Sequence, residues 1–590
     1  MTFELIYTAA LIVIMTICLI REVFEPDVII FATLVLLALG GVVTVEDAVS
    51  GFSNTGMLTV ALLFIVAAAL KNTGVLNTLG DWLSQGDASL TRKLLHFLFP
   101  VSLLSAFFNN TPIVAMFIPA VRSWARKADL PVSKLMIPLS YAAILGGTCT
   151  LIGTSTTLLV HGLLIANGYP GFGFFEISRV SVPVALVALL FIIFVMRHLL
   201  PSRKETMVEL GEHTREFVIE MKVEPEYRYT GHTIEQAGLR ELKGLYLFQI
   251  ERAGELLSFV GPREIIKSGD RLFFTGLPDT ILELQQTKGL SVIQDHEFDL
   301  KHYDSDKLGI FEVVVSANSP LIGKSVKKSD FRSHYNAVIL AIHRSGERIL
   351  KKIGDIVLRT GDTLLILADH KFAEKWYHSK DFYLVSRKAT TASKPRGYVW
   401  FSLSILGLMI VAMATGVIPI LISVALAALA LMISRTISMT DARNSIDWGV
   451  VIIIASAFGI SKAVEQSGLD DMIADFLIGL VGNWGPVAIL AAVYLLTSIY
   501  TEIITNNAAA ALVFPVALSA AHQAGLEPRP FFIALAIAAS ASFATPIGYQ
   551  TNLMVYGPGG YKFRDFIKVG LPMNLLVGIL IVIMISLLYF

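Results

Sequence analysis

Hydrophobic segments fill both ends of the chain and leave its middle polar. Several run for about 18 residues or more without a charged side chain, which is long enough to cross a bilayer as an α-helix. The hydrophobic segments as a whole lie near residues 3–20, 27–43, 56–71, 94–121, 135–165 and 179–200, and again near 398–415, 417–434, 448–461, 485–520, 530–556 and 569–590. Residues 204–395 have an ordinary, charged composition. The pattern predicts an α-helical polytopic membrane protein with a soluble insert at its centre.

Polar interruptions in the first hydrophobic series reappear in the second. Residues 108–119 match residues 504–515, and residues 152–158 match residues 547–553. The matched pairs include Asn110 with Asn506, 396 residues apart, and Gly153 with Gly548, 395 residues apart. Each interruption places small amides and hydroxyls within apolar sequence. Repeated halves with polar breaks at membrane depth indicate the substrate site of a transporter.

Helices that break inside a membrane need partners for their freed backbone N–H and C=O groups. At a break, a helix N-terminus offers N–H groups and a positive dipole to an anion, and carbonyl groups at a helix C-terminus can ligate a cation. The polar side chains at these breaks are neutral, so a buried divalent anion needs bound cations beside it. We therefore interpret the breaks as an anion–cation cotransport site. The alternative is that these residues only bridge helices or cap kinks.

The distribution of Lys and Arg orients the chain, since cytoplasmic segments are enriched in both. It predicts re-entrant hairpins at about 94–121 and 485–520, both termini outside, and a cytoplasmic central domain. The first half then has an odd number of full spans, so the second half is inverted relative to the first. Arg179, Lys462 and Arg529 are exceptions to this distribution. We expect a multi-pass protein of the inner or plasma membrane.

The paired breaks resemble those of the divalent anion/sodium symporter (DASS, sodium/sulfate–dicarboxylate) family, whose hairpins carry paired Ser-Asn-Thr motifs. Asn109-Asn110-Thr111 and Thr505-Asn506-Asn507 stand at those positions. The resemblance covers about 1–200 and 398–590. It implies Na⁺ as the coupled ion, an elevator motion and a homodimer. Relative to the family motif, Asn replaces Ser at 109, Thr replaces Ser at 505 and Asn replaces Thr at 507; the larger amides narrow the site and favour sulfate over a C4-dicarboxylate.

Candidate site residues follow from this resemblance and from the breaks themselves. The expected substrate contacts are Asn110, Thr111, Pro112, Asn506, Asn507, Thr545 and Pro546, with Thr157 and Asn552 as further donors. Sodium 1 is expected among Ser105, Asn109, Asn110, Cys149 and Thr150, and sodium 2 among Thr501, Ile504, Thr505, Asn506 and Ala544. Glu502 stands where the first half has Ala106. A carboxylate there is a candidate coupling group; the alternative is a carboxylate that faces water or bonds to Thr501.

The soluble insert is itself duplicated, at an offset of 92 residues from Asp270 to Asp362. Alternating apolar runs at 245–250 and 337–342 predict strands, and a Gly-Asp pair in each copy predicts a turn before the next strand. The copies resemble the RCK_C (TrkA-C) regulatory domain of potassium-channel and potassium-transporter regulators. This implies α/β modules that pair and bind small ligands. A basic patch of Lys324, Lys327, Lys328, Lys351 and Lys352 is either a solvated face or the site of a small anionic effector.

The predicted organisation has four parts. Membrane repeat 1 covers 1–203, RCK_C-like domains cover 204–295 and 296–390, and membrane repeat 2 covers 391–590. The chain has 47 basic and 47 acidic residues, so its charge gives no bias toward nucleic acid polymers. Its two cysteines, Cys18 and Cys149, allow neither a disulfide framework nor a zinc site.

The predicted function is sodium-coupled symport of a divalent oxyanion, with sulfate as the first candidate. A sodium-coupled C4-dicarboxylate carrier and a proton-coupled anion transporter are alternatives with the same architecture. A channel would need rings of like groups around a continuous pore rather than two mirrored hairpins. An enzyme is not expected, because the hydrophobic segments contain no nucleophile–base pair, metal motif or phosphate loop.

Overall fold

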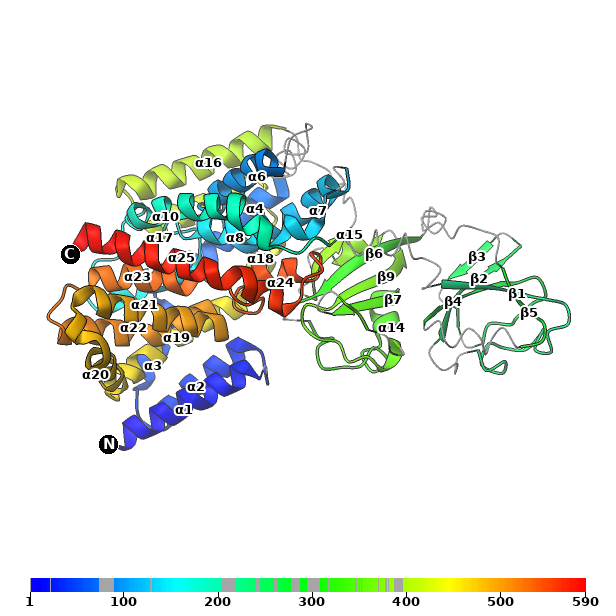
Figure 1. The fold of residues 1–590 in the computed structure, drawn as a ribbon, viewed down its shortest axis with the longest axis horizontal. Helices are drawn as coiled ribbons and strands as arrows, with labels where there is room; N and C mark the ends of the chain where they lie inside the picture. Colours follow the sequence, from blue (N-terminus) through cyan, green and yellow to red (C-terminus); the bar gives the residue numbers. More distant parts are fainter. Residues whose placement is uncertain are drawn as a thin grey trace.

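The helices form one body, and two β-sheets lie to one side of it (Figure 1). The computed structural model describes residues 2–21, 23–73, 90–127, 130–203, 218–239, 245–253, 255–258, 260–261, 263–276, 287–293, 308–316, 319–344, 347–349, 351, 353–369, 371–376, 379, 381–386 and 396–590. The expected domain boundaries at 204, 295–296 and 390–391 lie outside these residues. Both chain termini lie at the end of the helical body away from the sheets (Figure 1).

The two halves of the helical body run through the same order of elements. The first half contains α1 (Phe3–Ile20), α2 (Pro26–Leu39), α3 (Val45–Val49), α4 (Thr55–Thr73), α6 (Leu90–Ser105), α7 (Asn110–Lys127), α8 (Met136–Gly147), α9 (Ser155–Ala166), α10 (Ser178–Phe191) and α11 (Arg197–Leu199). The second contains α16 (Arg396–Thr415), α17 (Ile420–Ile433), α18 (Met439–Ser445), α19 (Trp448–Gln466), α20 (Leu469–Val481), α21 (Pro486–Ile503), α22 (Asn506–Gln523), α23 (Arg529–Ser540), α24 (Gln550–Tyr556) and α25 (Phe563–Tyr589). Only α20 lacks a counterpart among the described residues of the first half.

Corresponding elements begin in the same way where local sequence controls them. Short α3 follows Thr44, whose hydroxyl accepts a hydrogen bond of 3.1 Å from the Asp47 backbone N–H. Its counterpart α18 follows Ser438, which accepts one of 3.0 Å from the Asp441 N–H. Both are N-caps, which satisfy an N–H group that the first turn of a helix leaves free.

Seven helical segments in the described residues are long and apolar enough to cross a membrane. They are Phe3–Ile20, Val45–Leu70, Ser178–Leu199, Tyr398–Thr415, Trp448–Gln466, Pro486–Ile503 and Phe563–Tyr589. Large apolar side chains such as Val13, Leu408 and Leu575 are exposed on these helices. Apolar surface in this arrangement is suited to contact with lipid chains. The chain is an integral membrane protein with multiple spans.

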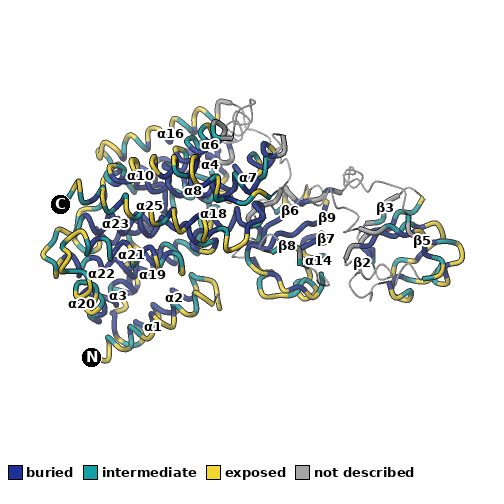
Figure 2. Tube along the Cα trace, viewed as in Figure 1, coloured by how far each residue is buried: buried dark blue, intermediate teal, exposed yellow. Residues whose placement is uncertain are grey.

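Helices of one half pack on helices of the other in a reciprocal way. Helix α2 packs on α19, and its counterpart α17 packs on α4. Helix α7 contacts α24, and the corresponding α22 contacts α9. Helix α8 is buried along its whole length, and exposed residues follow outer helices such as α1 and α16 (Figure 2). The broken helices therefore lie in the interior, where their polar groups are shielded from lipid.

Each sheet has five antiparallel strands in the same order. The first contains β1 (Val218–Val223), β2 (Leu245–Arg252), β3 (Glu255–Ser258), β4 (Arg271–Gly276) and β5 (Leu290–Val292), arranged β3-β2-β4-β1-β5. The second contains β6 (Leu308–Val315), β7 (Ala337–Arg344), β8 (Glu347–Arg348), β9 (Thr363–Asp369) and β10 (Phe382–Ser386), arranged β8-β7-β9-β6-β10, with α14 (Phe331–Tyr335) and α15 (Lys371–Trp376). The two runs predicted as strands are confirmed, since they lie in β2 and β7.

One ion pair is repeated in both sheets at the predicted offset. Arg252 donates two hydrogen bonds of 2.9 Å to the carboxylate of Asp270. Arg344 donates two of 2.7 Å to Asp362. Both aspartates are fully buried and directly precede β4 and β9. The bidentate pair therefore fixes the turn that leads into the central strand of each sheet.

The second sheet packs directly on the helical body. Arg122 of α7 and Glu312 of β6 form an ion pair of 2.5 Å, and each side chain is 3% exposed. Val314 of β6 belongs to the same hydrophobic core as the helices. Gly557, directly after α24, lies so close to Thr363 of β9 that a Cβ at this glycine would overlap the threonine hydroxyl. The second sheet thus contacts α7 and α24 at the ends remote from the polar breaks.

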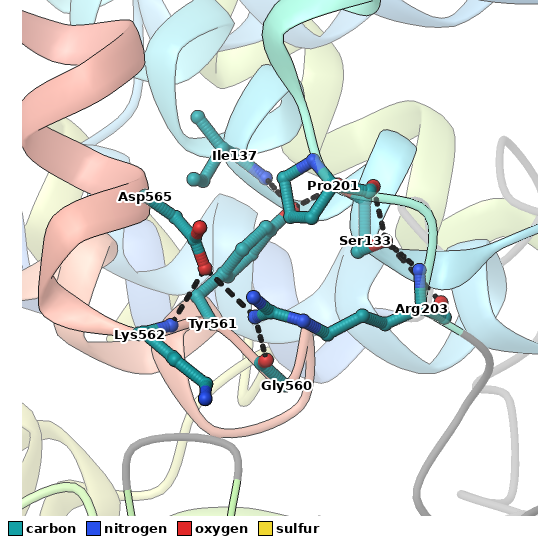
Figure 3. A network of polar contacts seen from close by, with 8 residues as sticks. All are labelled: Ser133, Ile137, Pro201, Arg203, Gly560, Tyr561, Lys562 and Asp565. Atoms are coloured by element: carbon teal, nitrogen blue, oxygen red, sulfur yellow. Dashed lines mark hydrogen bonds and ion pairs between the residues drawn. The ribbon is translucent and has the colours of Figure 1, made fainter.

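The segment that follows α11 is tied to the loop between α24 and α25 (Figure 3). Arg203 donates to the Gly560 carbonyl oxygen and pairs with Asp565 at 2.7 Å. Tyr561, fully buried in the same loop, donates to the carbonyl oxygen of Ser133 just before α8. The loop after α24 is therefore held by the segment that leads toward the first sheet and by the residues just before α8.

Basic residues that depart from the expected charge distribution have acidic partners. Arg529 at the start of α23 forms two hydrogen bonds with the Glu176 carboxylate, of 2.7 and 2.6 Å. Burial alone would raise the pKa of Glu176, but the bonds and charge of Arg529 outweigh it and lower that pKa. Lys462 pairs with Glu465 at 3.0 Å. The Arg529 pair joins the α9–α10 loop of one half to the other half.

Candidate functional site

The tip of the first hairpin is built around Asn110. Helix α6 ends at Ser105 and α7 begins at Asn110. The Ser105 hydroxyl donates a hydrogen bond of 2.6 Å to the Asn110 side-chain oxygen. Asn109 caps α7, since its side-chain oxygen accepts from the Thr111 N–H at 3.3 Å. The tip thus directs the amide group of Asn110, which is 1% exposed, into the interior.

The tip of the second hairpin repeats this arrangement. The hydroxyl of Thr501, near the end of α21, donates a hydrogen bond of 2.9 Å to the side-chain oxygen of Asn506, the first residue of α22. The spacing of five residues equals that from Ser105 to Asn110. The Thr501 hydroxyl also lies 2.7 Å from the Ala539 carbonyl oxygen, which ties the hairpin to the end of α23.

Each hairpin tip contacts the broken helix of the opposite half. Thr111 donates a hydrogen bond of 2.9 Å to the Gln550 side-chain oxygen at the start of α24. Ser155 at the start of α9 donates one of 3.3 Å to the Asn507 side-chain oxygen. Thr111 and Asn507 are matched positions, and so are Ser155 and Gln550. The two cross-contacts are therefore equivalents of each other.

Tyr549 joins the tips at the centre of the site. Asn110 donates a hydrogen bond of 2.6 Å to its hydroxyl, and the Thr154 hydroxyl lies 3.4 Å from the same oxygen. Thr154 precedes Ser155, which bonds to Asn507. A continuous set of polar contacts therefore connects the first hairpin, both broken helices and the second hairpin.

The residues of this cluster are neutral and mostly buried. The buried members are Ser105, Asn110, Thr154, Thr156, Thr157, Thr501, Asn507, Tyr549, Thr551 and Asn552. Helices α7 and α22 both start here, so their N-termini place partial positive charge at the cluster. An anion can accept hydrogen bonds from these donors, but its full charge needs a cation nearby.

The predicted substrate residues do not all face this centre. Asn552 donates to the carbonyl oxygens of Ser542 and Thr545, at 3.0 and 3.1 Å, and accepts from Ser140 at 2.7 Å. Its side chain therefore holds the second broken helix together. Thr157 is buried one turn into α9, Pro112 is half-buried in the first turn of α7, and Pro546 is buried in the loop before α24.

Carbonyl oxygens of two helix ends converge at the position predicted for sodium 1. A Cβ built at Gly153 would lie 2.9 Å from the Ser105 carbonyl oxygen and would overlap that of Gly147. These residues end α6 and α8. Helix C-termini carry partial negative charge and attract cations. Thr150 donates a hydrogen bond to the Ala106 carbonyl oxygen, and the Cys149 carbonyl oxygen accepts one of 2.5 Å from Ser178. These two bonds connect the loop after α8 to the end of α6 and to the start of α10.

Oxygens also gather around Gly548, in the loop that follows Ala544, one of the residues predicted for sodium 2. A Cβ built at Gly548 would overlap the Ser542 hydroxyl and lie 2.8 Å from Thr545 Oγ1 and 3.0 Å from Glu502 Oε2. In the described residues, the buried hydroxyls of Thr505, Ser540 and Ser542 have no hydrogen-bond partner. Buried hydroxyls without partners are uncommon and point to a bound ion or water.

Glu502 has a defined place at the second break. Its carboxylate accepts hydrogen bonds of 2.8, 2.9 and 2.8 Å from the backbone N–H groups of Phe543, Ala544 and Thr545. The Asn574 amide of α25 donates a fourth, of 2.7 Å. Three consecutive N–H groups form an anion-binding concavity, and Glu502 fills it from within the protein.

A cavity opens beside the first hairpin tip. Asn109 and Ser155 line its polar wall, and Val60 and Phe64 of α4 face them with Leu406 and Met409 of α16. The cavity therefore lies between the polar cluster and the outer helices.

Sequence reasoning missed Tyr549, Thr154, Gln550 and Ser155. All four lie within or beside the matched segments 152–158 and 547–553. The offset of 395 residues that pairs Thr154 with Tyr549 could have found them, since the same offset pairs Gly153 with Gly548.

Comparison with known proteins identifies the family. A model of the CitMHS citrate transporter family matches residues 14–536 and 504–590. A "Putative sulfur deprivation response regulator" of Chlamydomonas reinhardtii is 36% identical over 97% of this chain and 99% of its own length. A "Probable sodium/sulfate cotransporter 3" of the same organism is 27% identical over 91% of this chain and 83% of its own length. An uncharacterized transporter of Synechocystis is 31% identical over 100% of this chain and 97% of its own length. These similarities point to a transporter rather than an enzyme, and the chain belongs to the CitMHS citrate transporter family.

Proposed function

We propose that this protein is a sodium-coupled secondary active symporter for a divalent oxyanion, with sulfate as the first substrate. The observation that carries the proposal is the neutral, buried cluster in which both hairpin tips meet both broken helices through Tyr549 and Thr154. Three similar proteins are named as sodium/sulfate cotransporters, one of them as a probable one, which supports both the ion and the anion.

The substrate would bind between the tips of α7 and α22. Asn110, Thr111, Asn506, Asn507 and Thr545 would donate hydrogen bonds to its oxygens. The starts of both helices add partial positive charge. Pro112 and Pro546 would shape the site beside them, and Thr157 and Asn552 would support it.

Two sodium ions would supply the charge that the neutral cluster lacks. Sodium 1 fits beside Gly153, where the carbonyl ends of α6 and α8 converge near Ser105 and Asn110. Sodium 2 would bind near Gly548, where the Ser542 hydroxyl has no partner among the described residues and the Glu502 carboxylate is close. Thr505, whose hydroxyl also has no partner in the described part of the chain, would be a further ligand. Oxygen ligands in neutral or singly charged groups suit a hard monovalent cation. In this proposal the Glu502 carboxylate holds the backbone of the second break in place and links the position of that backbone to cation binding.

We propose that the two membrane halves are inverted repeats that work by an elevator motion in a homodimer. The reciprocal packing of α2 on α19 and α17 on α4 supports a two-fold relation between the halves. Termini at one end and sheets at the other support an arrangement with both termini outside and the insert in the cytoplasm. The hairpins and broken helices would move together against the outer helices.

We propose that residues 204–295 and 296–390 are two RCK_C-like regulatory domains. Their equal strand order and the repeated Arg–Asp pair support a duplicated module. The second domain touches α7 and α24, whose other ends carry Asn110 and Gln550. A movement of this domain would therefore reach the substrate site through these two helices. The exposed Lys324, Lys327, Lys328 and Lys351 would bind a small anionic effector; Lys352 lies outside the described residues.

A second candidate is a carboxylate carrier of the same architecture. The matching family model is described as a citrate transporter, which favours a substrate with carboxylate groups. Proton coupling in place of sodium coupling is a further variant, with Glu502 as the group that binds the proton.

Uptake of labelled sulfate into proteoliposomes tests the proposal. We expect saturable uptake driven by an inward sodium gradient and blocked weakly by succinate or citrate. Asn110→Ala and Asn506→Ala should each reduce uptake about tenfold or more, because each leaves a buried partner unsatisfied. Sodium-independent uptake, or stronger block by succinate than by unlabelled sulfate, would reject sodium coupling or the sulfate assignment.

A further inference from the structure

Tyr549 breaks the symmetry of the site at its centre. The matched position in the first half is Thr154, and the two side-chain oxygens lie 3.4 Å apart. One half thus contributes a small hydroxyl and the other a whole phenol ring, which is 8% exposed. The ring fills space on one side of the site that would be open if the halves were equal.

We infer that Tyr549 determines substrate specificity: its ring limits the site to a compact oxyanion, and its hydroxyl donates a hydrogen bond to that anion. This inference rests on the proposed transport function. It assigns the selection between sulfate and longer dicarboxylates to one side chain.

Hydrogen bonding around the phenol supports the second part of the inference. The Asn110 amide donates to the Tyr549 oxygen at 2.6 Å, so the phenol is already an acceptor. Its own proton remains available as a donor. The Thr154 hydroxyl lies 3.4 Å from the Tyr549 oxygen, which is too far for a strong O–H···O hydrogen bond. A sulfate oxygen placed between the tips would be a better acceptor, because hydrogen bonds to charged groups are about twice as strong as neutral ones.

Packing around the tip supports the first part. A Cβ at Gly147 would overlap the Asn110 side-chain oxygen, so the Asn110 side chain is packed against the end of α8. The short hydrogen bond from Asn110 therefore holds the phenol hydroxyl in place. A longer substrate could enter only if the ring were absent or displaced.

Two substitutions separate the roles of ring and hydroxyl. Tyr549→Thr makes the central positions of both halves alike and removes the ring, so succinate and citrate should gain potency as inhibitors relative to unlabelled sulfate. Tyr549→Phe keeps the ring and removes the donor, so KM for sulfate should rise by about tenfold while dicarboxylates remain poor inhibitors.

The readout is the ratio of inhibition constants for succinate and sulfate, measured in proteoliposomes. This ratio does not depend on the amount of folded protein, so a merely structural role of Tyr549 would leave it unchanged. Tyr494→Phe is the matched control, since Tyr494 is another buried tyrosine and lies against Gly578 of α25. It should keep the wild-type ratio.

The outcomes distinguish this inference from the proposed function. A wild-type protein that transports no sulfate under a sodium gradient would overturn the proposed function itself. If the wild-type protein transports sulfate but the Tyr549→Thr variant keeps the wild-type ratio of inhibition constants, only the assignment of specificity to Tyr549 is overturned.

Discussion

The contact between Arg122 and Glu312 gives the sharpest prediction about the soluble insert. The pair joins α7 to β6 at 2.5 Å, and both side chains are 3% exposed. Removal of one partner from a buried ion pair leaves an uncompensated charge and costs about 3–5 kcal/mol. We therefore expect Glu312→Leu or Arg122→Met to destabilise the docking of the second sheet by about this amount.

The double variant Arg122→Met/Glu312→Leu should behave differently from either single change. Replacing a buried ion pair by apolar side chains of similar volume is often neutral or stabilising, because neither charge then has to be desolvated. We expect the double variant to approach wild-type stability. Its coupling energy, obtained from the double-mutant cycle, should be several kcal/mol.

Thermal unfolding of the purified protein and hydrogen exchange along β6 provide the assay. Single variants should unfold at lower temperature and exchange faster along β6 than the double variant. The matched control is Lys462→Met, which removes one partner of an exposed pair within α19 and should cost less than about 1 kcal/mol. Additive effects of the two single changes would refute the view that this pair holds the insert on α7.

Three further changes address the site and its surroundings. Glu502→Gln replaces an acceptor of four N–H groups by an amide, so half-saturation by sodium should rise about tenfold or more in uptake assays; an unaltered sodium and pH profile would remove Glu502 from the cation site. Gly153→Ala places a methyl group against two helix-end carbonyls and should weaken sodium binding. The control Gly173→Ala places its methyl group at ordinary contact distances and should leave sodium binding unchanged. Equal sodium affinities of the two variants would argue against the sodium 1 site. Burial and then the charge of Asp471 raise the pKa of Asp470 to about 6 from 3.8, against backbone bonds that lower it. The folded protein then binds the proton more tightly, so stability falls as pH rises from about 4 through 6; Asp470→Asn should remove this loss in thermal unfolding, and an unchanged pH dependence would contradict the assigned cause.

The hairpin tips could be predicted from sequence because their signal is local. Asn110 and Asn506 are polar residues in apolar segments, and each begins a helix after a break. Their bonds to Ser105 and Thr501 span only five residues. Local composition and internal repetition were therefore enough to indicate both tips.

The long-range partners of the hairpin tips gave no signal in their local composition. Tyr549 is 439 residues from Asn110, and an aromatic residue in an apolar segment is ordinary in composition. The role of Asn552 was equally hidden, because an inward turn of its amide toward Ser542 depends on packing around the second break. The Arg122–Glu312 pair joins a membrane helix to a strand, and only the docking of the insert brings the two charges together.

The measurement that tests the central claim most directly is sodium-dependent binding of labelled sulfate to the purified protein. We predict saturable binding that requires sodium, is lost in Asn110→Ala and in Asn506→Ala alike, and persists in the Tyr494→Phe control. Binding that is indifferent to sodium, or that survives when either asparagine is removed, would contradict a single shared site between the two hairpin tips.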